Sequence, residues 1–194
     1  MKAIILAAGQ GTRLREIFWE KPKPLFEIGG RSLLERSLDS LTQNGIRKIT
    51  IAVGYNGNLI REKIGGGFKG ASVSYANNEI HHMTGSMHSL YKAIDTPQEC
   101  LVLDGDIVYP PEIINEIVNH KEENLVLLTR LSQSGDEVHA LLDEHNVRHL
   151  TKGYKGEEKS FEFTGISKFS AKFLQKIIEL HLENIENGKF GEYY

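Results

Sequence analysis

Residues 2–14 read Lys2-Ala3-Ile4-Ile5-Leu6-Ala7-Ala8-Gly9-Gln10-Gly11-Thr12-Arg13-Leu14, a short apolar run that breaks into a glycine loop. The run is typical of a buried strand. The small residues after it let main-chain N–H groups approach an anion closely. Arg13 and Lys23 add a planar guanidinium and a compact ammonium, two cations that suit a polyphosphate. The stretch therefore predicts a strand followed by a phosphate-handling loop.

This loop fits neither of two common nucleotide-binding motifs. The dinucleotide pattern needs a third glycine at the position that Leu14 occupies. The Gly-Lys-Ser/Thr sequence of a Walker loop is also missing from it. Because a tight glycine turn after a strand occurs in many α/β proteins, the rest of the chain has to identify the ligand.

Apolar runs and helix-like segments alternate over the first 128 residues. Such alternation predicts βαβ units, and so an α/β fold with a mostly parallel, Rossmann-like central sheet and helices on both faces. Ser32 and Glu35 predict a capping box at the start of one helix, which Asn44-Gly45 ends. Pro110-Pro111 opens a later helix. The predicted strand and helix pairs are 4–6 with 33–41, 49–53 with 59–64, 73–75 with 87–94 and 101–103 with 113–118, followed by a strand at 125–128.

The pattern changes after Leu128. Short alternating segments at 138–142, 147–151 and 161–163 predict a small antiparallel layer covering the C-terminal edge of the sheet. An amphipathic helix from Phe173 to Ile185 follows and ends near Asn187-Gly188. We expect a single domain over residues 1–194.

Composition narrows the class of protein. The chain has 194 residues, 40% hydrophobic and 25% charged, with a formal net charge of −3. Such a charge argues against a nucleic-acid surface, which needs a concentrated basic face. The single cysteine, Cys100, excludes an intrachain disulfide and lies in an apolar run typical of a buried strand. No run is long enough to span a membrane and the first one lacks a cleavage region, so we expect a cytoplasmic protein without membrane contact.

Two acidic residues follow the apolar run at 101–103. Asp104 and Asp106 would stand at the carboxyl end of a buried strand, the edge at which open α/β sheets bind ligands. One or two carboxylates together with substrate phosphates is the usual arrangement for Mg²⁺ at a nucleotide site. The alternative is an Asp-Gly turn that carries two exposed acids.

The string from Leu6 to Leu14, with Pro22-Lys23-Pro24-Leu25 ten residues after the arginine, resembles the signature of nucleotidyltransferases that activate sugar phosphates and small phospho-alcohols. The resemblance implies a GT-A-like nucleotidyltransferase fold, Arg13 and Lys23 as catalytic residues, and Asp106 as the Mg²⁺ ligand. Lys21 is the alternative lysine, and it is better interpreted as a solvated loop residue. The implied nucleotide-binding residues in this half are Leu6, Ala7, Ala8, Gly9, Gln10, Gly11, Thr12, Arg13, Lys23 and Asp104.

A polar cluster between the third predicted strand and its helix resembles the phosphocholine cytidylyltransferase branch of these enzymes. On that basis Asn78, Thr84, Gly85 and Ser86 are candidates for contacts with the base or ribose, whereas helix capping by Thr84 or Ser86 is the alternative. The glutamine-rich base loop of the uridylyl- and thymidylyltransferases is not visible here. CTP is therefore favoured over UTP, dTTP and GTP.

Lys152 and Glu162 resemble the acceptor side of the family's site, a lysine near the acceptor phosphate and a glutamate before a Thr-Gly turn. Solvated strand residues are the alternative. The acceptor stays open among phosphocholine, a phosphonate, a phosphorylated polyol or amide, and a sugar phosphate. His81, His82 and His88 match no zinc spacing and suggest surface exposure or proton transfer. Trp19 is best explained by packing.

The expected reaction is attack of an acceptor phosphate oxygen on the α-phosphorus of CTP, with release of pyrophosphate. A hexose 1-phosphate uridylyl-, thymidylyl- or guanylyltransferase and a non-catalytic nucleotide-binding module are the rival interpretations. The apolar residues in 189–194 have no obvious partner, and a typical member of the family continues with another helix and strand, so we expect a truncated or short member. Family members usually take a second metal carboxylate from a segment that would lie after Tyr194, and Asp104 is the candidate to compensate for it. The oligomeric state is left open, a homodimer included.

Overall fold

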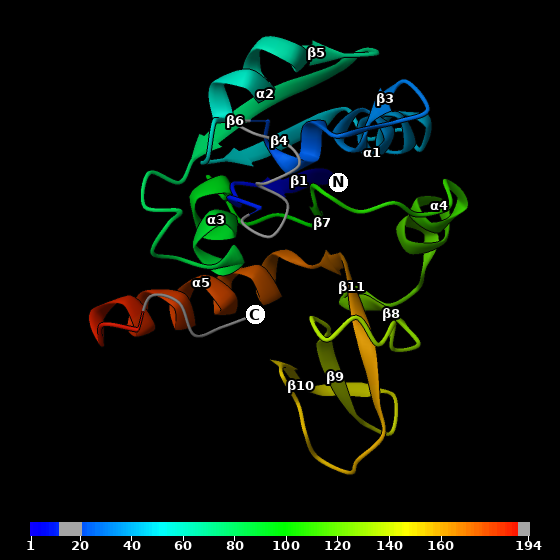
Figure 1. The fold of residues 1–194 in the computed structure, drawn as a ribbon, viewed down its shortest axis with the longest axis vertical. Helices are drawn as coiled ribbons and strands as arrows, with labels where there is room; N and C mark the ends of the chain where they lie inside the picture. Colours follow the sequence, from blue (N-terminus) through cyan, green and yellow to red (C-terminus); the bar gives the residue numbers. More distant parts are fainter. Residues whose placement is uncertain (12–20, 190–194) are drawn as a thin grey trace.

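The computed structural model describes residues 1–11 and 21–189 (Figure 1). Within them, nine strands form one sheet in the order β10-β9-β11-β7-β1-β4-β6-β5, and β8 also pairs with β11. Its centre is parallel: β1 (Lys2–Ala7) lies between β7 (Cys100–Asp104) and β4 (Lys48–Val53), and β4 pairs with β6 (Ala71–Asn77). The predicted α/β fold with a parallel centre is confirmed.

Helices cover both faces of this sheet. The larger core packs the apolar sides of α1 (Leu33–Gln43), α2 (Gly57–Ile64) and α4 (Glu112–Asn119) against inward side chains such as Ile5, Ile51 and Leu103. The opposite face carries α3 (Ser86–Ala93) and α5 (Ala171–Glu186), which pack on Ile4 and Val102. Alternate residues of one strand face opposite cores, which explains why the central strands are apolar throughout.

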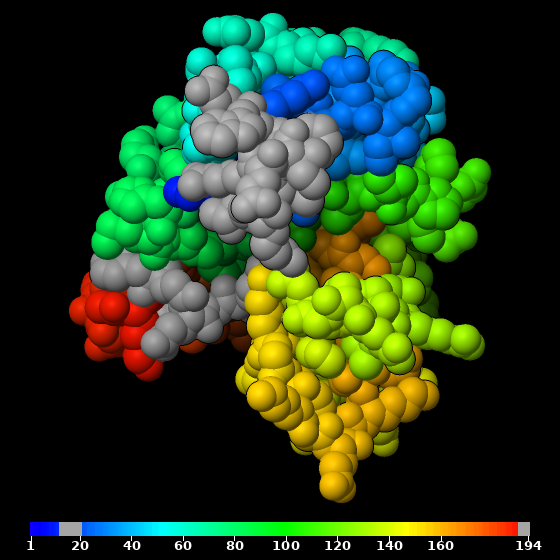
Figure 2. Space-filling model, viewed as in Figure 1, coloured from blue at the N-terminus to red at the C-terminus, as the bar shows by residue number. Residues whose placement is uncertain are grey.

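The antiparallel strands extend the main sheet. β11 (Ser160–Phe169) runs beside β7 and also pairs with β8 (Leu125–Thr129) and β9 (Val138–Asp143), while β10 (Asn146–Lys152) pairs with β9. They form the lower lobe of the molecule, coloured yellow-green to orange in Figure 2. The segment expected to end the series of βαβ units, β8, is thus antiparallel to its neighbour. Its apolar pattern indicates a strand but carries no information about direction.

The remaining elements are short. Two-residue strands β2 (Glu27–Ile28) and β3 (Arg31–Ser32) form a hairpin, and β5 (Gly67–Phe68) adds an edge to β6. The 3-10 helix η2 (Lys23–Leu25) follows the segment 12–20 and begins directly after Pro22. The capping box of Ser32 and Glu35 at α1 is present, with both reciprocal hydrogen bonds formed.

Candidate active site

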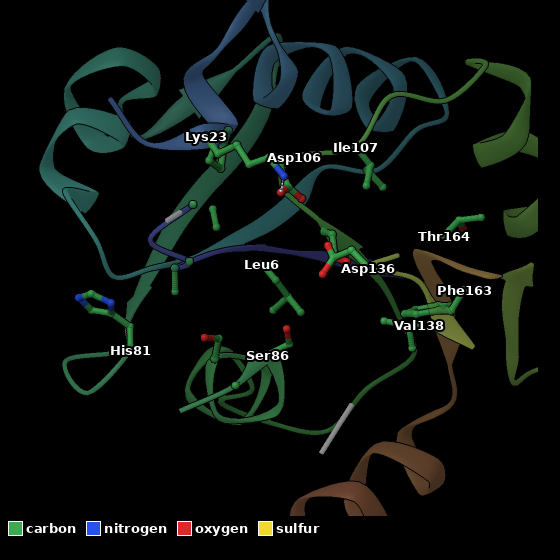
Figure 3. Close-up of a pocket in the computed structure, with 18 of the residues that line it drawn as sticks. Leu6, Lys23, His81, Ser86, Asp106, Ile107, Asp136, Val138, Phe163 and Thr164 are labelled. Carbon is green, nitrogen blue, oxygen red and sulfur yellow. Dashed lines mark ion pairs between the residues drawn. The ribbon is translucent and has the colours of Figure 1, made fainter. Parts of the chain in front are cut away.

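A cavity of about 560 Å³ opens where the parallel strands end (Figure 3). Because β1 and β7 are parallel neighbours, with Leu6 opposite Asp104, both deliver their following loops to this edge. The carbonyl of Leu6 accepts a 2.8 Å hydrogen bond from the N–H of Gly105. Predicted residues that line the cavity are Leu6, Ala7, Ala8, Gly9, Gly11, Lys23, Thr84, Gly85, Ser86, Asp104, Asp106, Lys152 and Glu162.

Gly105 is required by this close approach. A Cβ at this position would lie 2.9 Å from the carbonyl oxygen of Leu6 and 3.2 Å from Cγ of Pro24. The Asp-Gly-Asp turn therefore packs directly on β1 and on η2, and a side chain here would push these segments apart.

Lys23 reaches across the cavity to the acidic turn. Its Nζ lies 2.6 Å from Oδ2 of Asp106, and each side chain is about one-third exposed. Buried Pro22 and Pro24 fix the backbone on either side of the lysine. Lys21 is instead outside the cavity, exposed, with its Nζ 3.2 Å from Oε1 of Glu27. The local fold thus separates the two lysines that the sequence offered.

Asp104 and Asp106 lie in different environments. Asp104 packs under β11, where Gly165, with φ of +84°, leaves no room for a side chain because a Cβ would stand 2.5 Å from Oδ2 of Asp104. Burial, and then the charge of Asp106, raise the pKa of Asp104 to about 7, while Lys152 and Lys23 act in the opposite direction. The outer carboxylate, Asp106, is the one more available to a ligand.

These residues suit Mg²⁺ that arrives with a nucleotide. Among residues 1–11 and 21–189, no group of three or more His, Cys, Asp or Glu is arranged to hold a metal alone. The contact between Lys23 and Asp106 shows that a cation fits at the outer carboxylate. Mg²⁺ prefers oxygen ligands and commonly completes its shell with phosphate oxygens and water. One or two carboxylates at this edge therefore fit a metal shared with phosphates.

The four residues of the polar cluster before α3 do not all line the cavity. Thr84, Gly85 and Ser86 line the cavity, but Asn78 is only 1% exposed and lies behind its wall. The Asn78 Nδ2 donates hydrogen bonds of 3.0 Å to Oγ of Ser89 and Oγ1 of Thr84. The Asn78 amide nitrogen thus holds the loop that carries Thr84 and Ser89.

The capping alternative for this cluster is not what the structure shows. Gly85 is the N-cap residue of α3 and no side chain caps this helix. The Thr84 hydroxyl donates to the carbonyl of Ile80 at 3.0 Å, within the loop. The hydroxyl of Ser86 lies at the first turn of the helix, beside the cavity (Figure 3).

Lys152 and Glu162 reach the cavity from the antiparallel lobe. Lys152 ends β10, where it pairs with Val138, and Glu162 lies in β11 between β8 and β9. Oε2 of Glu162 accepts a 2.7 Å hydrogen bond from the N–H of Ser132. The lobe thus forms the side of the cavity opposite His81, with Asp136, Val138 and Phe163 in the same region (Figure 3).

Several lining residues were missed by sequence reasoning. Asp136 comes from the loop between β8 and β9, and a single acid in a polar loop gives no signal of its own. His81 lies at the other end of the cavity, and burial together with the charge of His82 lowers its pKa. The missed lining residues are Pro24, His81, Ser89, Ile107, Asp136, Val138, Phe163 and Thr164.

Some of the residues singled out in the sequence are not found among those that line the cavity. Gln10 is described but does not line it. Thr12, Arg13 and Trp19 lie outside the described residues. In the part of the chain that the structure describes, none of the helices has the length and apolar character needed to cross a membrane.

Residues 3–165 match the family model described as the MobA-like NTP transferase domain. A CMP-5'-(3-aminopropyl)phosphonate synthase from Streptomyces rubellomurinus is 30% identical over 67% of this chain and 21% of its own. A UTP–glucose-1-phosphate uridylyltransferase from Haloferax volcanii is 28% identical over 63% of this chain and 50% of its own. The matches thus span half or less of these two relatives.

Two further comparisons cover most of the chain. A CTP:phosphoglutamine cytidylyltransferase from Campylobacter jejuni is 24% identical over 93% of this chain and 78% of its own. The solved structure of CTP:phosphocholine cytidylyltransferase from Streptococcus pneumoniae has a TM-score of 0.76, at 24% identity, over 98% of this chain and 80% of its own. The likeness to that structure supports the fold.

Proposed function

This chain belongs to the MobA-like NTP transferase family, and on that premise we propose that it transfers CMP from CTP to a small phosphorylated or phosphonate acceptor and releases pyrophosphate. One observation carries the proposal. A single cavity holds the glycine loop, the Lys23–Asp106 pair and the Lys152–Glu162 side together. A donor and an acceptor that bind at opposite ends would meet at the charged pair.

The chemistry needs positioning and charge neutralisation more than a base. An acceptor phosphate oxygen forms a bond to the α-phosphorus while the bond to the pyrophosphate oxygen breaks, and an ionised phosphate needs no proton removed. In the proposal Arg13 and the N–H groups from Ala8 to Thr12 hold the leaving pyrophosphate. Lys23 neutralises charge on the α-phosphate, and Lys152 holds the acceptor phosphate.

Magnesium is proposed as the cofactor, held by Asp106 with Asp104 beside it. When bound, the ion supplies Lewis-acid neutralisation of the phosphate oxygens. The carboxylate of Asp106 would bind the ion. Lys23, which pairs with this carboxylate in the structure, would then neutralise the phosphates instead. Asp104, half-buried beside β11, also lines the cavity and is proposed as the second carboxylate.

The proposed nucleotide end is the His81 side of the cavity. Thr84, Gly85 and Ser86 offer main-chain and hydroxyl groups there, and Asn78 holds the loop from behind. CTP is supported by two relatives, one named as a CMP-5'-(3-aminopropyl)phosphonate synthase and the other as a CTP:phosphoglutamine cytidylyltransferase. We propose that the protein works in the cytoplasm, where CTP is available.

Pyrophosphate release tests the proposal. We expect Mg²⁺-dependent release with CTP and a small phosphorylated acceptor, above the rate with UTP, dTTP or GTP. The assay crosses the four nucleotides with phosphocholine, an aminoalkyl phosphonate, glycerol phosphate and glucose 1-phosphate. Tight CTP binding without release for any acceptor would identify a nucleotide-binding module instead.

A uridylyltransferase that acts on a hexose 1-phosphate is the second candidate, because one relative of this chain is named as a glucose-1-phosphate uridylyltransferase. Release that requires UTP and glucose 1-phosphate in the same assay would establish this candidate and overturn the first.

A further inference from the structure

The acidic turn in the cavity already has a cationic partner. Nζ of Lys23 lies 2.6 Å from Oδ2 of Asp106, the distance of a charge-assisted hydrogen bond, and both side chains line the cavity. The dashed line in Figure 3 marks this ion pair. Asp106 is also the carboxylate proposed to hold magnesium. The ammonium of Lys23 therefore takes up one of the oxygens that a divalent ion would need.

The fold holds both members of this pair in place. The 3-10 helix η2, which carries Lys23, packs on the turn that carries Asp106, because a Cβ at Gly105 would lie 3.2 Å from Cγ of Pro24. The stem of the lysine also contacts the glycine loop, since a Cβ at Gly11 would lie 3.5 Å from Cβ of Lys23 and 3.9 Å from its Cδ. Lys23 thus lies between the glycine loop and the acidic turn, and its flexible end can reach groups bound at either of them.

The charges around the turn do not favour a divalent ion on its own. Asp104 and Asp106 line the same cavity as Lys23 and Lys152, so that the formal charges of the two acids and the two lysines cancel. Within the described part of the chain, no third His, Cys, Asp or Glu side chain completes a metal-binding group with the two acids. A divalent ion that approaches the nucleotide-free protein would therefore meet as much positive charge as negative charge.

Resting on the proposed function, we infer that Lys23 occupies the Asp106 carboxylate in the free protein and gives way to a divalent ion only when a nucleoside triphosphate is bound. The phosphates carry more negative charge than one carboxylate and draw the ammonium toward themselves. The carboxylate of Asp106 is then left beside phosphate oxygens, which complete the ligand set that Mg²⁺ prefers. The nucleotide thus creates the metal site, and by linkage the ion and the nucleotide each tighten the binding of the other.

Titration of Mn²⁺ into the nucleotide-free protein tests this inference. Isothermal titration calorimetry on the full chain should show weak binding for the wild type. Lys23→Met keeps an unbranched side chain of similar length without the charge. This variant should bind Mn²⁺ at least about 10-fold more tightly, because a positive charge a few ångströms from a divalent ion has been removed. Lys21→Met, whose lysine pairs with Glu27 at the surface, is the matched control and should bind as the wild type does.

A second substitution assigns the effect to Asp106. Adding Asp106→Asn to Lys23→Met should abolish the tighter Mn²⁺ binding, since a neutral amide replaces the carboxylate. Asp106→Asn alone should bind CTP about fivefold more tightly than the wild type in EDTA, because the ammonium no longer has to leave a carboxylate to reach the phosphates. Glu162→Gln removes a charge elsewhere in the same cavity and should change this affinity less. Circular dichroism checks that each variant is folded.

These binding measurements need no turnover, so their outcome is separate from that of the proposed function. Mn²⁺ binding to the nucleotide-free wild type as tight as to Lys23→Met, or equally weak binding to both, would overturn the inference and leave nucleotidyl transfer intact. Weaker binding of CTP to Asp106→Asn than to the wild type in EDTA would overturn it as well. Failure of pyrophosphate release with every nucleotide and acceptor would overturn the proposed function, while the Mn²⁺ titration would still decide whether Lys23 excludes the ion.

Discussion

At the level of single residues, Lys23 illustrates how local chemistry selects a side chain. Lys21 and Lys23 lie within the four residues before Leu25, and prolines on both sides of Lys23 restrict its backbone. In the structure its ammonium lies 2.6 Å from Asp106, whereas Lys21 pairs with Glu27 at the surface. The sequence favoured Lys23, but its contact with Asp106 depends on a residue far along the chain.

Replacing Lys23 by alanine should strongly reduce turnover. Removal of one preorganised group that neutralises transition-state charge typically costs about 10² to 10³-fold. The measurement is kcat for pyrophosphate release at saturating CTP, with circular dichroism as the check of folding. Lys21→Ala is the matched control and should stay near wild type. Full activity of Lys23→Ala with an inactive Lys21→Ala would reverse the assignment.

At the level of elements, α1 begins at a cap that the sequence predicts. Ser32 accepts from the N–H of Glu35, and the Glu35 carboxylate accepts from the N–H of Ser32. The helix is anchored beneath the sheet by fully buried Leu34, Leu38 and Leu41. Since α1 follows η2 and the hairpin, its fixed start also limits where the Lys23 segment can lie. Contacts between α1 and η2 are direct.

Ser32→Ala should lower the free energy of unfolding by about 1 kcal/mol, because an N-cap side chain satisfies a helix N–H that is otherwise unpaired. Urea denaturation followed by circular dichroism measures the change. Hydrogen bonds from Ser32 lower the pKa of Glu35. The ionised Glu35 therefore adds to the free energy of unfolding above the usual pKa of a glutamate, and this added stability is lost as pH falls through the lowered pKa.

Glu35→Gln provides the control for this acid dependence. Glutamine still accepts a hydrogen bond from the Ser32 N–H but does not ionise. The variant should therefore keep most of the stability that the cap provides, and its free energy of unfolding should no longer change with pH around the lowered pKa of Glu35. A Ser32→Ala protein as stable as the wild type at pH 7 would show that the capping box does not stabilise α1.

On the scale of the whole molecule, α3 and α5 join distant parts of the chain over one face of the sheet (Figure 1). His88 Nδ1 and His181 Nε2 lie 3.1 Å apart at this contact, and both residues are buried. Burial is the main cause that lowers the pKa of each histidine. Lys92 further lowers the pKa of His88, and Glu79 partly opposes it.

The free energy of unfolding should therefore fall as pH drops below about 6.5, the ordinary histidine pKa. The unfolded chain takes up protons there that the folded pair, with its lowered pKa values, does not. Urea denaturation at pH 7.5 and 5.5 measures this loss, and His181→Gln should show a smaller one. The exposed His145→Gln is the control and should keep the wild-type dependence; an unchanged dependence in His181→Gln would exclude the pair as its source.

What the sequence determined by itself is local. Apolar periodicity identified the central strands and helices, and Ser32 and Glu35 marked a helix start. The glycine loop with Pro22-Lys23-Pro24-Leu25 identified the nucleotidyltransferase family. These signals arise within a few residues, where spacing sets which side chains share a face and which backbone groups are capped. They do not depend on which residues pack against the other side of the sheet.

Only the tertiary structure decided which distant groups meet. It placed Asn78 behind the cavity wall, brought Asp136 into the cavity, and turned β8 antiparallel to β11. Strand partners and loop positions depend on the packing of whole elements. A single acidic residue in a loop, or a short apolar run, does not indicate which residues it will contact in the fold. The sequence therefore offered the glycine loop and Lys23 for the nucleotide half of the proposed site, and Lys152 and Glu162 for its acceptor half, whereas the place of Asp136 in the cavity came only from the fold.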